Sequence, residues 1–302
     1  ATTEIYTLSL HDALPISPGW IKFMEHFYPE LIPHASTCKS PMQMLSTLIK
    51  SYFAEQKSLN PADIYVVAVM PCVAKKYEAK RPEHSNDLGF PYTDAVITTR
   101  ELIWMMKAYG IDFVNLPDND FDQPLGYSTG AGDIFGSTGG VMEAALRTAA
   151  ELITGRPMDS IEYTDVRQVQ GLKEASVEID GKTINIAVAN GLNNAKTILE
   201  KVKSGEKQFH LIEIMACPGG CVAGGGQPLS HVEKYIYPLD PDVIKKRQQA
   251  LYNIDSNKPI RKSHENPFIK KLYEEFLENP GSHKSHRLLH THYVERNPRG
   301  IK

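Results

Sequence analysis

The feature that most constrains this chain is the segment from Glu213 to Pro228, which reads EIMACPGGCVAGGGQP. Cys217 and Cys221, half of the chain's four cysteines, stand four residues apart in it. Thiolates this close can converge on a metal, and glycine lets the backbone approach an inorganic cluster without a Cβ in the way. Soft thiolates favour an iron–sulfur cluster, but spacing alone leaves zinc and buried structural thiols as alternatives.

Composition narrows the class of protein. The chain has 302 residues, of which 41% are hydrophobic and 23% charged, and these values are typical of a soluble globular protein. A net charge of -3 argues against nucleic acid as the main partner, and no apolar stretch is long enough for a membrane span. Four cysteines are too few for a disulfide scaffold. We therefore expect a reducing compartment, the cytoplasm, with an export signal upstream of the chain left open.

The N-terminus has a different character from the rest. Residues 1–16 spell the translation of a common sequencing-adapter strand, and a short native strand or tail is the alternative. They lack the charged and apolar regions of a signal peptide. We therefore expect a non-native segment at 1–16, followed at 17–302 by one domain that is incomplete on its N-terminal side.

Two predicted strands have the same sequence pattern at their C-terminal ends. The runs Ile64–Met70 and Phe209–Met215 are largely apolar, end at a methionine and deliver a cysteine two residues later. The first is rich in β-branched residues and is predicted to be a buried parallel strand. Strands alternating with helices along the chain indicate an α/β fold with parallel sheet. Ligands in open α/β sheets bind beyond the carboxyl ends of the strands, so both cysteine groups are candidate site residues.

The second cysteine motif carries a cation. It runs from Met70 to Glu78, MPCVAKKYE, with Lys75 three residues after Cys72. A lysine there is either a solvated surface charge or, beside a thiolate-bound cluster, a donor to an anionic ligand. Cys38 is predicted to be a buried thiol. The four histidines between His283 and His292 are predicted to belong to a solvated tail rather than to a metal site.

Taken together, these motifs resemble the catalytic domain of the [FeFe]-hydrogenases. Residues 70–78 match that family's M-P-C-x-x-K-x-x-E motif, and residues 213–228 match its E-x-M-A-C-x-x-G-C-x-x-G-G-G-x-P motif. Pro18-Gly19-Trp20 matches the end of its T-S-C-C-P-G-W motif. The resemblance extends over residues 36–41, 94–102 and 138–147. It implies an α/β fold of two lobes, with mainly parallel sheets flanked by helices and a metal cluster in the cleft between them.

The resemblance also implies a cofactor, the H-cluster, in which a [4Fe–4S] cluster is bridged to a two-iron centre carrying CO, cyanide and azadithiolate. Its implied protein ligands are Cys72, Cys217 and Cys221, with Cys221 as the bridge. Lys75 would hydrogen-bond a cyanide, and Ser40 would lie in the wall of the same pocket.

Further site residues follow from the same resemblance. Met70 and Met215 would pack against the two-iron centre, Phe135 would close the pocket, and Ser36 occupies the family's proton-relay position. Where the family has paired cysteines, this chain has Ile16-Ser17. The second of that pair is the fourth cluster ligand and the first is the proton-transfer thiol. The chain as written is therefore predicted to be inactive.

The function implied is reversible H₂ oxidation and proton reduction. Electrons would be exchanged with ferredoxin or a flavoprotein carrier, and maturation proteins would supply the two-iron centre. Two alternatives are a non-catalytic iron–sulfur relative of the assembly or prelamin-interacting type, and a sensory hydrogenase-like protein. The complete Lys75 motif favours the enzyme, because a protein without the two-iron centre has no cyanide to contact.

Overall fold

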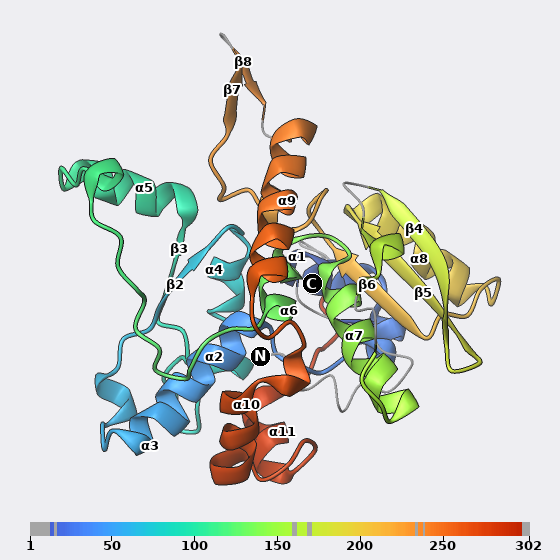
Figure 1. The fold of residues 1–302 in the computed structure, drawn as a ribbon, viewed down its shortest axis with the longest axis horizontal. Helices are drawn as coiled ribbons and strands as arrows, with labels where there is room; N and C mark the ends of the chain where they lie inside the picture. The colour runs from blue at the N-terminus through green and yellow to red at the C-terminus, as the bar shows by residue number, and fades with distance from the viewer. Residues whose placement is uncertain are drawn as a thin grey trace.

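A computed structural model describes residues 13–14, 17–158, 162–167, 171–232, 235–237 and 239–297 (Figure 1). Most of the expected segment 1–16 thus lies outside the described residues. The strands are β1 (Ala13–Leu14), β2 (Val67–Met70), β3 (Ala95–Thr98), β4 (Leu172–Ile179), β5 (Lys182–Asn190), β6 (Leu211–Met215), β7 (Ser230–Val232) and β8 (Tyr235–Tyr237). The helices are α1 (Pro18–Phe27), α2 (Pro41–Leu48), α3 (Ala54–Gln56), α4 (Lys75–Glu78), α5 (Thr99–Ala108), α6 (Gly130–Asp133), α7 (Gly140–Thr154), α8 (Leu192–Lys203), α9 (Pro241–Asn257), α10 (Pro267–Leu272) and α11 (His283–Leu289).

The larger sheet forms the centre of one lobe. Its strand order is β1-β6-β5-β4, in which β6 runs parallel to both β1 and β5, and β4 pairs antiparallel with β5. The β4–β5 connection is the hairpin that the sequence predicts at Asp180-Gly181. Both residues have positive φ, 51° and 74°, as a two-residue hairpin turn requires.

Helices cover both faces of this sheet, because alternate residues of its central strands are apolar on each side. One core joins α7 to residues such as Ile186 and Met215, and the other joins α1 and α8 to residues such as Ala187 and Ile214. The sheet is therefore the middle of three layers. Helix α7 begins after Gly139 and ends at Gly155, both of which are left-handed.

The second lobe contains the parallel pair β2–β3 with α4 and α5. Figure 1 shows it on the opposite side of α9 from the larger sheet. The expected α/β fold with two lobes and mainly parallel sheets is confirmed. The buried environment expected for β2 is wrong, since Val67 and Val69 are 47% and 44% exposed. Within the described chain β2 pairs with β3 alone, and α5 buries none of its own side chains.

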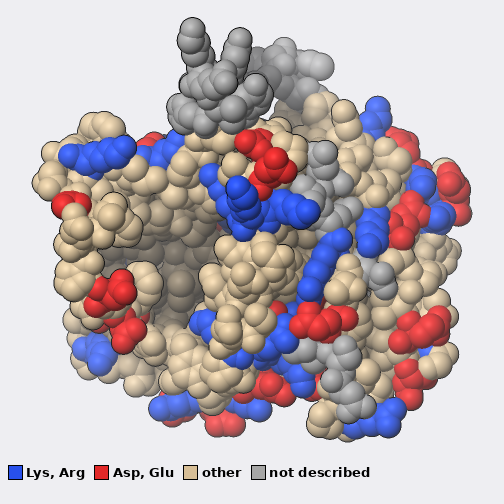
Figure 2. Space-filling model, turned by 45° about the horizontal axis from the view of Figure 1, so that its top comes forward, with Lys and Arg blue, Asp and Glu red and all other residues tan. Residues whose placement is uncertain are grey.

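The distribution of charged side chains on the surface agrees with the low net charge of the chain. Figure 2 shows Lys and Arg interspersed with Asp and Glu, and a hollow on the side of the molecule that carries α5. None of the described helices combines the length and the apolar character that a membrane crossing needs.

The C-terminal part packs on the rest of the chain instead of forming the solvated tail predicted from its histidines. Helices α10 and α11 share an apolar core with α2, against which Cys38 packs, half-buried. Residues 290–296, which we call the C-terminal strap, then cross the segment before α2. His290 forms an antiparallel bridge with Cys38, and the Thr291 N–H donates to Thr37 O at 2.7 Å. The other three histidines of this region are exposed.

Candidate metal centre

Two of the predicted cysteine ligands lie just beyond the carboxyl ends of strands, as the sequence predicts, and the third lies further along the same loop. Cys72 follows β2 through Pro71, and Cys217 follows β6 through Ala216. Cys221 opens the short 3₁₀ turn Cys221–Ala223. The two strands belong to different lobes, so the candidate centre is built where the lobes meet.

The thiols of these cysteines influence one another's ionisation. Burial, followed by the nearby Cys72 thiol, raises the pKa of Cys217. Burial likewise raises the pKa of Cys221 to about 12; the Lys75 ammonium opposes this, and Cys72 and Cys217 add to it. Metal coordination would have to deprotonate these thiols, because the thiolate is the ligand. The structure thus brings Lys75 and all three predicted cysteine ligands into one electrostatic environment.

The spacing of the sulfurs bears on the kind of metal. Four thiolates about 2.3 Å from one zinc ion lie roughly 4 Å apart. Among the described residues, only Glu151, His264 and Glu265 form a group of three or more ligand atoms within 4.8 Å of one another. In the metal-free structure the three cysteine sulfurs are therefore not all within 4.8 Å of one another. A wider arrangement suits a cluster in which each thiolate binds a different iron.

The glycines of the cysteine motif hold two loops together. A Cβ on Gly224 would stand 2.2 Å from Pro71 O, and one on Gly220 would stand 2.6 Å from Thr138 N. The Gly226 N–H donates to Pro71 O at 2.8 Å. In the structure these glycines thus permit backbone to approach backbone, which keeps the Cys217–Cys221 loop beside Cys72.

Lys75 is buried and paired. Its ammonium donates to both carboxylate oxygens of Glu78, at 3.0 and 2.8 Å. The Ser40 hydroxyl donates to the same carboxylate in place of capping α2. The alternative prediction, that Lys75 is a solvated surface charge, is therefore wrong. We call these three residues the Lys75–Glu78–Ser40 network. The sequence motif contains Glu78 without indicating its role, although an acid three residues after a lysine is a signal for such a pair.

Residues 17 and 36 are both buried serines. The Ser17 Oγ accepts a hydrogen bond from the Ala216 N–H at 3.1 Å, next to Cys217. The Ser36 Oγ accepts one from the Cys38 N–H at 3.3 Å. Ile16 lies outside the described residues.

The three apolar residues expected around the two-iron centre are divided between two cores. Met70 packs beside Met42 in the second lobe, and Met215 is fully buried in the core under α7. Phe135, in the turn Ile134–Gly136, is partly buried against that same core. Phe135 also lines a 500 Å³ cavity with Pro41, Phe268 and Leu272, and its closing role stays a prediction.

Glu213 is a site residue that sequence reasoning missed. Its carboxylate is fully buried and accepts hydrogen bonds from the N–H groups of Gly139, at 2.6 Å, and Met142, at 2.8 Å. Burial raises the pKa of Glu213 to about 7, against the lowering effect of these hydrogen bonds. An acid inside the apolar run Leu211–Met215 was the available signal. The contact ties the strand that delivers the cysteines to the start of α7.

Helix α9 clamps the cysteine loop from outside. Arg247 donates to Val222 O at 3.0 Å and to Pro228 O at 2.8 Å, and Gln248 donates to Gly219 O at 3.0 Å. No sequence signal marked these two residues, because their role depends on a contact between distant segments.

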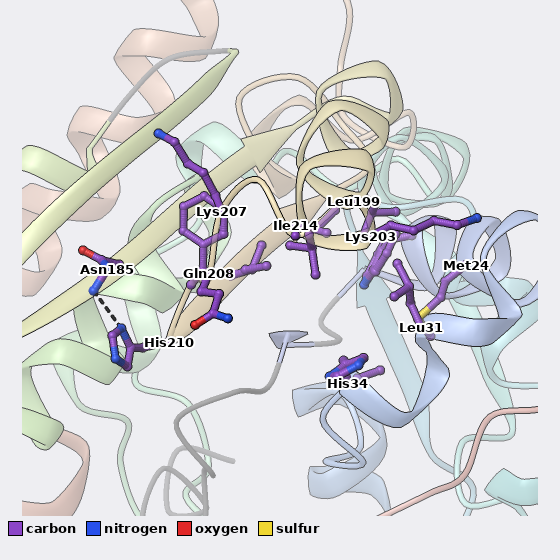
Figure 3. A pocket seen from close by; sticks show the side chains of 16 residues that line it. Met24, Leu31, His34, Asn185, Leu199, Lys203, Lys207, Gln208, His210 and Ile214 are labelled. Atoms are coloured by element: carbon purple, nitrogen blue, oxygen red, sulfur yellow. Dashed lines mark hydrogen bonds between the residues drawn. The ribbon is translucent and has the colours of Figure 1, made fainter.

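A cavity of 760 Å³ lies elsewhere, between α1, α8 and the larger sheet (Figure 3). Its walls include Met24, Leu199 and Ile214, and His210 on its rim accepts a hydrogen bond from the Asn185 N–H at 2.9 Å. None of the predicted site residues lines it. The candidate metal centre and this apolar cavity are therefore separate features.

The fold and the site define a two-lobed α/β protein with a cysteine-based candidate metal centre. Residues 14–225 match the family described as "Iron only hydrogenase large subunit, C-terminal domain", and residues 241–296 match "Iron hydrogenase small subunit". The chain belongs to the iron-only hydrogenase family.

Among curated relatives, it is 52% identical to the NADP-reducing hydrogenase subunit HndD of Solidesulfovibrio fructosivorans, over 92% of this chain and 46% of that protein. It is 34% identical to the cytosolic Fe-S cluster assembly factor narfl of Xenopus tropicalis, over 91% of this chain and 57% of that protein. The chain thus spans about half the length of these relatives.

Among solved structures, the apo [FeFe]-hydrogenase HydA1 from Chlamydomonas reinhardtii, in a single-residue variant, superposes with a TM-score of 0.81. It is 41% identical, over 98% of this chain and 80% of that one. These neighbours confirm the hydrogenase resemblance and the fold. Because relatives of the assembly type also match, membership of the family does not by itself fix an activity.

Proposed function

We propose that the chain is the cluster-binding part of a hydrogenase that interconverts H₂ with protons and electrons. The observation that carries the proposal is the burial of the Lys75 ammonium beside three thiols, where it lowers the pKa of Cys221 against the effect of burial. Two of its three N–H donors contact Glu78, which leaves one for an anionic ligand. A buried cation at this place suits a cyanide-bearing centre.

In this proposal Cys72, Cys217 and Cys221 would hold a [4Fe–4S] cluster, and Cys221 would also connect it to the two-iron centre. When bound, that centre supplies a site for H₂ and an amine base. The chain's own residues bind and orient it. Lys75 anchors an anionic ligand, Ser40 and the two methionines Met70 and Met215 form walls, and Phe135 excludes water.

Ser36 and the residue at position 17 have different roles. Ser36 passes protons, and Ser17 stands where the fourth thiolate is needed. A hydroxyl is a poor ligand for iron in such a cluster, so the chain with Ser17 is proposed to be inactive.

Electrons would come from ferredoxin or a flavoprotein carrier, and maturation proteins would insert the two-iron centre. We place this chemistry in the cytoplasm, because free thiols for cluster binding persist in a reducing compartment. The alternative function is iron–sulfur cluster assembly, which the narfl relative favours.

The test uses the variant Ile16→Cys/Ser17→Cys, reconstituted without oxygen with iron, sulfide and a synthetic two-iron cofactor. The proposal predicts infrared bands of bound CO and cyanide, and H₂ evolution from reduced methyl viologen. Lys75→Met is expected to lower cofactor retention by about tenfold, since a hydrogen bond to a charged group is lost. Lys76→Met is the matched control, because Lys76 is paired with Glu101 outside the pocket. A failure to retain the cofactor and evolve H₂ would favour the assembly function.

A further inference from the structure

A third and much smaller cavity adjoins the Lys75–Glu78–Ser40 network. It has a volume of 20 Å³ and lies between α1, Glu78 and the C-terminal strap, and its lining includes Ser40, His84 and Thr291. A cavity of this size holds one water molecule but no larger ligand.

Two polar atoms in residues that line this cavity have no hydrogen-bond partner among the described residues. They are His84 Nδ1 and Thr291 Oγ1, and both atoms are buried. His84 as a whole is 4% exposed. An unpaired buried polar atom costs about 1–3 kcal/mol, so two such atoms in residues that line one cavity indicate a shared partner.

The charges around the cavity select the kind of partner. Burial and, to a smaller extent, the cations Lys39, Arg81 and Lys75 together lower the pKa of His84 to about 3, so the imidazole is neutral. These cations disfavour a bound cation, and the Glu78 carboxylate disfavours a bound anion. A neutral molecule that both donates and accepts hydrogen bonds is compatible with both the cations and the carboxylate.

We propose that this cavity binds one water molecule, held by the Glu78 carboxylate, His84 Nδ1 and the Thr291 hydroxyl. Three partners is the usual number for a buried water. The water connects the Lys75–Glu78–Ser40 network to the C-terminal strap. The strap is fixed independently on both sides, where Thr291 N–H donates to Thr37 O and Arg296 N–H donates to Glu25 O at 2.9 Å.

Through this water, the C-terminal strap would support the Glu78 carboxylate, which orients the Lys75 ammonium. Glu78 accepts hydrogen bonds from Lys75 and Ser40, and the water would be a third donor to the same carboxylate. Metal binding is not needed for this arrangement, so the site is testable on the metal-free chain and independently of the proposed function.

A high-resolution crystal structure of the metal-free chain is the direct test. We expect one density peak within about 3.2 Å of Glu78, His84 Nδ1 and Thr291 Oγ1. The peak should disappear or move in Thr291→Val. It should persist in Thr47→Val, a matched control, because the Thr47 hydroxyl is also buried and unpaired but does not line the cavity.

Amide hydrogen exchange provides a second test of the proposal, in solution. Loss of one hydrogen bond should speed exchange of the Thr291 amide by roughly fivefold in Thr291→Val, and leave it unchanged in Thr47→Val. A cavity without density in the wild-type crystal, or equal exchange rates in both variants, would overturn the proposal.

Discussion

The hydroxyl of Ser17 accepts a hydrogen bond from the backbone N–H of Ala216 at 3.1 Å, which places residue 17 directly beside Cys217. This contact joins the start of α1 to the loop that carries two cysteines. A side chain at position 17 therefore reaches the candidate metal centre without any change of fold.

Ser17→Cys should supply a fourth thiolate. After anaerobic reconstitution, we expect the variant to bind about four irons per chain and to give the EPR signal of a reduced [4Fe–4S] cluster. The unchanged chain, with three thiolates, should bind less iron or give a three-iron signal. Ser46→Cys is the control, because Ser46 is also buried but accepts a hydrogen bond from Thr93 in the other lobe. Equal iron content in all three proteins would contradict this role of position 17.

Gly224→Ala should separate the two cysteine loops. Its Cβ would stand 2.2 Å from Pro71 O, so the backbone next to Cys72 must move. We expect a loss of about 1–3 kcal/mol in the free energy of unfolding, measured with urea, together with weaker iron binding.

Gly225→Ala provides the comparison for that variant. The nearest atom to its Cβ would be a Val73 methyl at 3.7 Å, an ordinary contact. Its stability should stay within about 0.5 kcal/mol of the original. If the two alanine variants behave alike, the loops are not held by this contact.

Glu213 should make the metal-free protein less stable as pH rises. Burial raises its pKa from 4.5 to about 7 in the folded state, so between these values the folded chain binds a proton that the unfolded chain has lost. Stability from this group is complete below pH 4.5 and falls by roughly 3 kcal/mol as pH approaches 7. Urea unfolding at pH 5 and pH 8 should show this fall, reduced in Glu213→Gln. A Gln variant with an unchanged pH slope would be inconsistent with it.

Arg147→Met should destabilise the junction of α7 and α9. Arg147 is buried and donates to Asp255 at 2.8 and 2.9 Å and to Glu143 at 2.8 Å. Its removal leaves two buried carboxylates short of a partner, for an expected loss of about 3 kcal/mol in unfolding free energy. Lys203→Met breaks an exposed pair with Glu30 and should cost less than about 1 kcal/mol. Equal urea midpoints for the two variants would contradict the stabilising role of the buried Arg147 ion pairs.

The sequence predicted the parts of the site that are local along the chain. The methionine-to-cysteine layout located Cys72 and Cys217 at strand ends, and Asp180-Gly181 located a hairpin. The sequence could not predict contacts between segments that are far apart along the chain. The exposure of Val67 depends on which strands flank β2, and the clamp of Arg247 on Val222 O depends on how α9 packs. The four histidines between His283 and His292 gave no signal that residues 290–296 would cross the segment before α2.

The central claim is that Cys72, Cys217 and Cys221 together hold an iron–sulfur cluster. Mössbauer spectroscopy of the chain reconstituted with ⁵⁷Fe and sulfide tests it most directly, with the triple variant Cys72→Ser/Cys217→Ser/Cys221→Ser beside it. We predict the spectrum of a cluster with sulfide-bridged irons in the original chain, and none in the triple variant. Iron that binds equally well to both proteins, or a chain that takes up one zinc ion and no cluster, would contradict the claim.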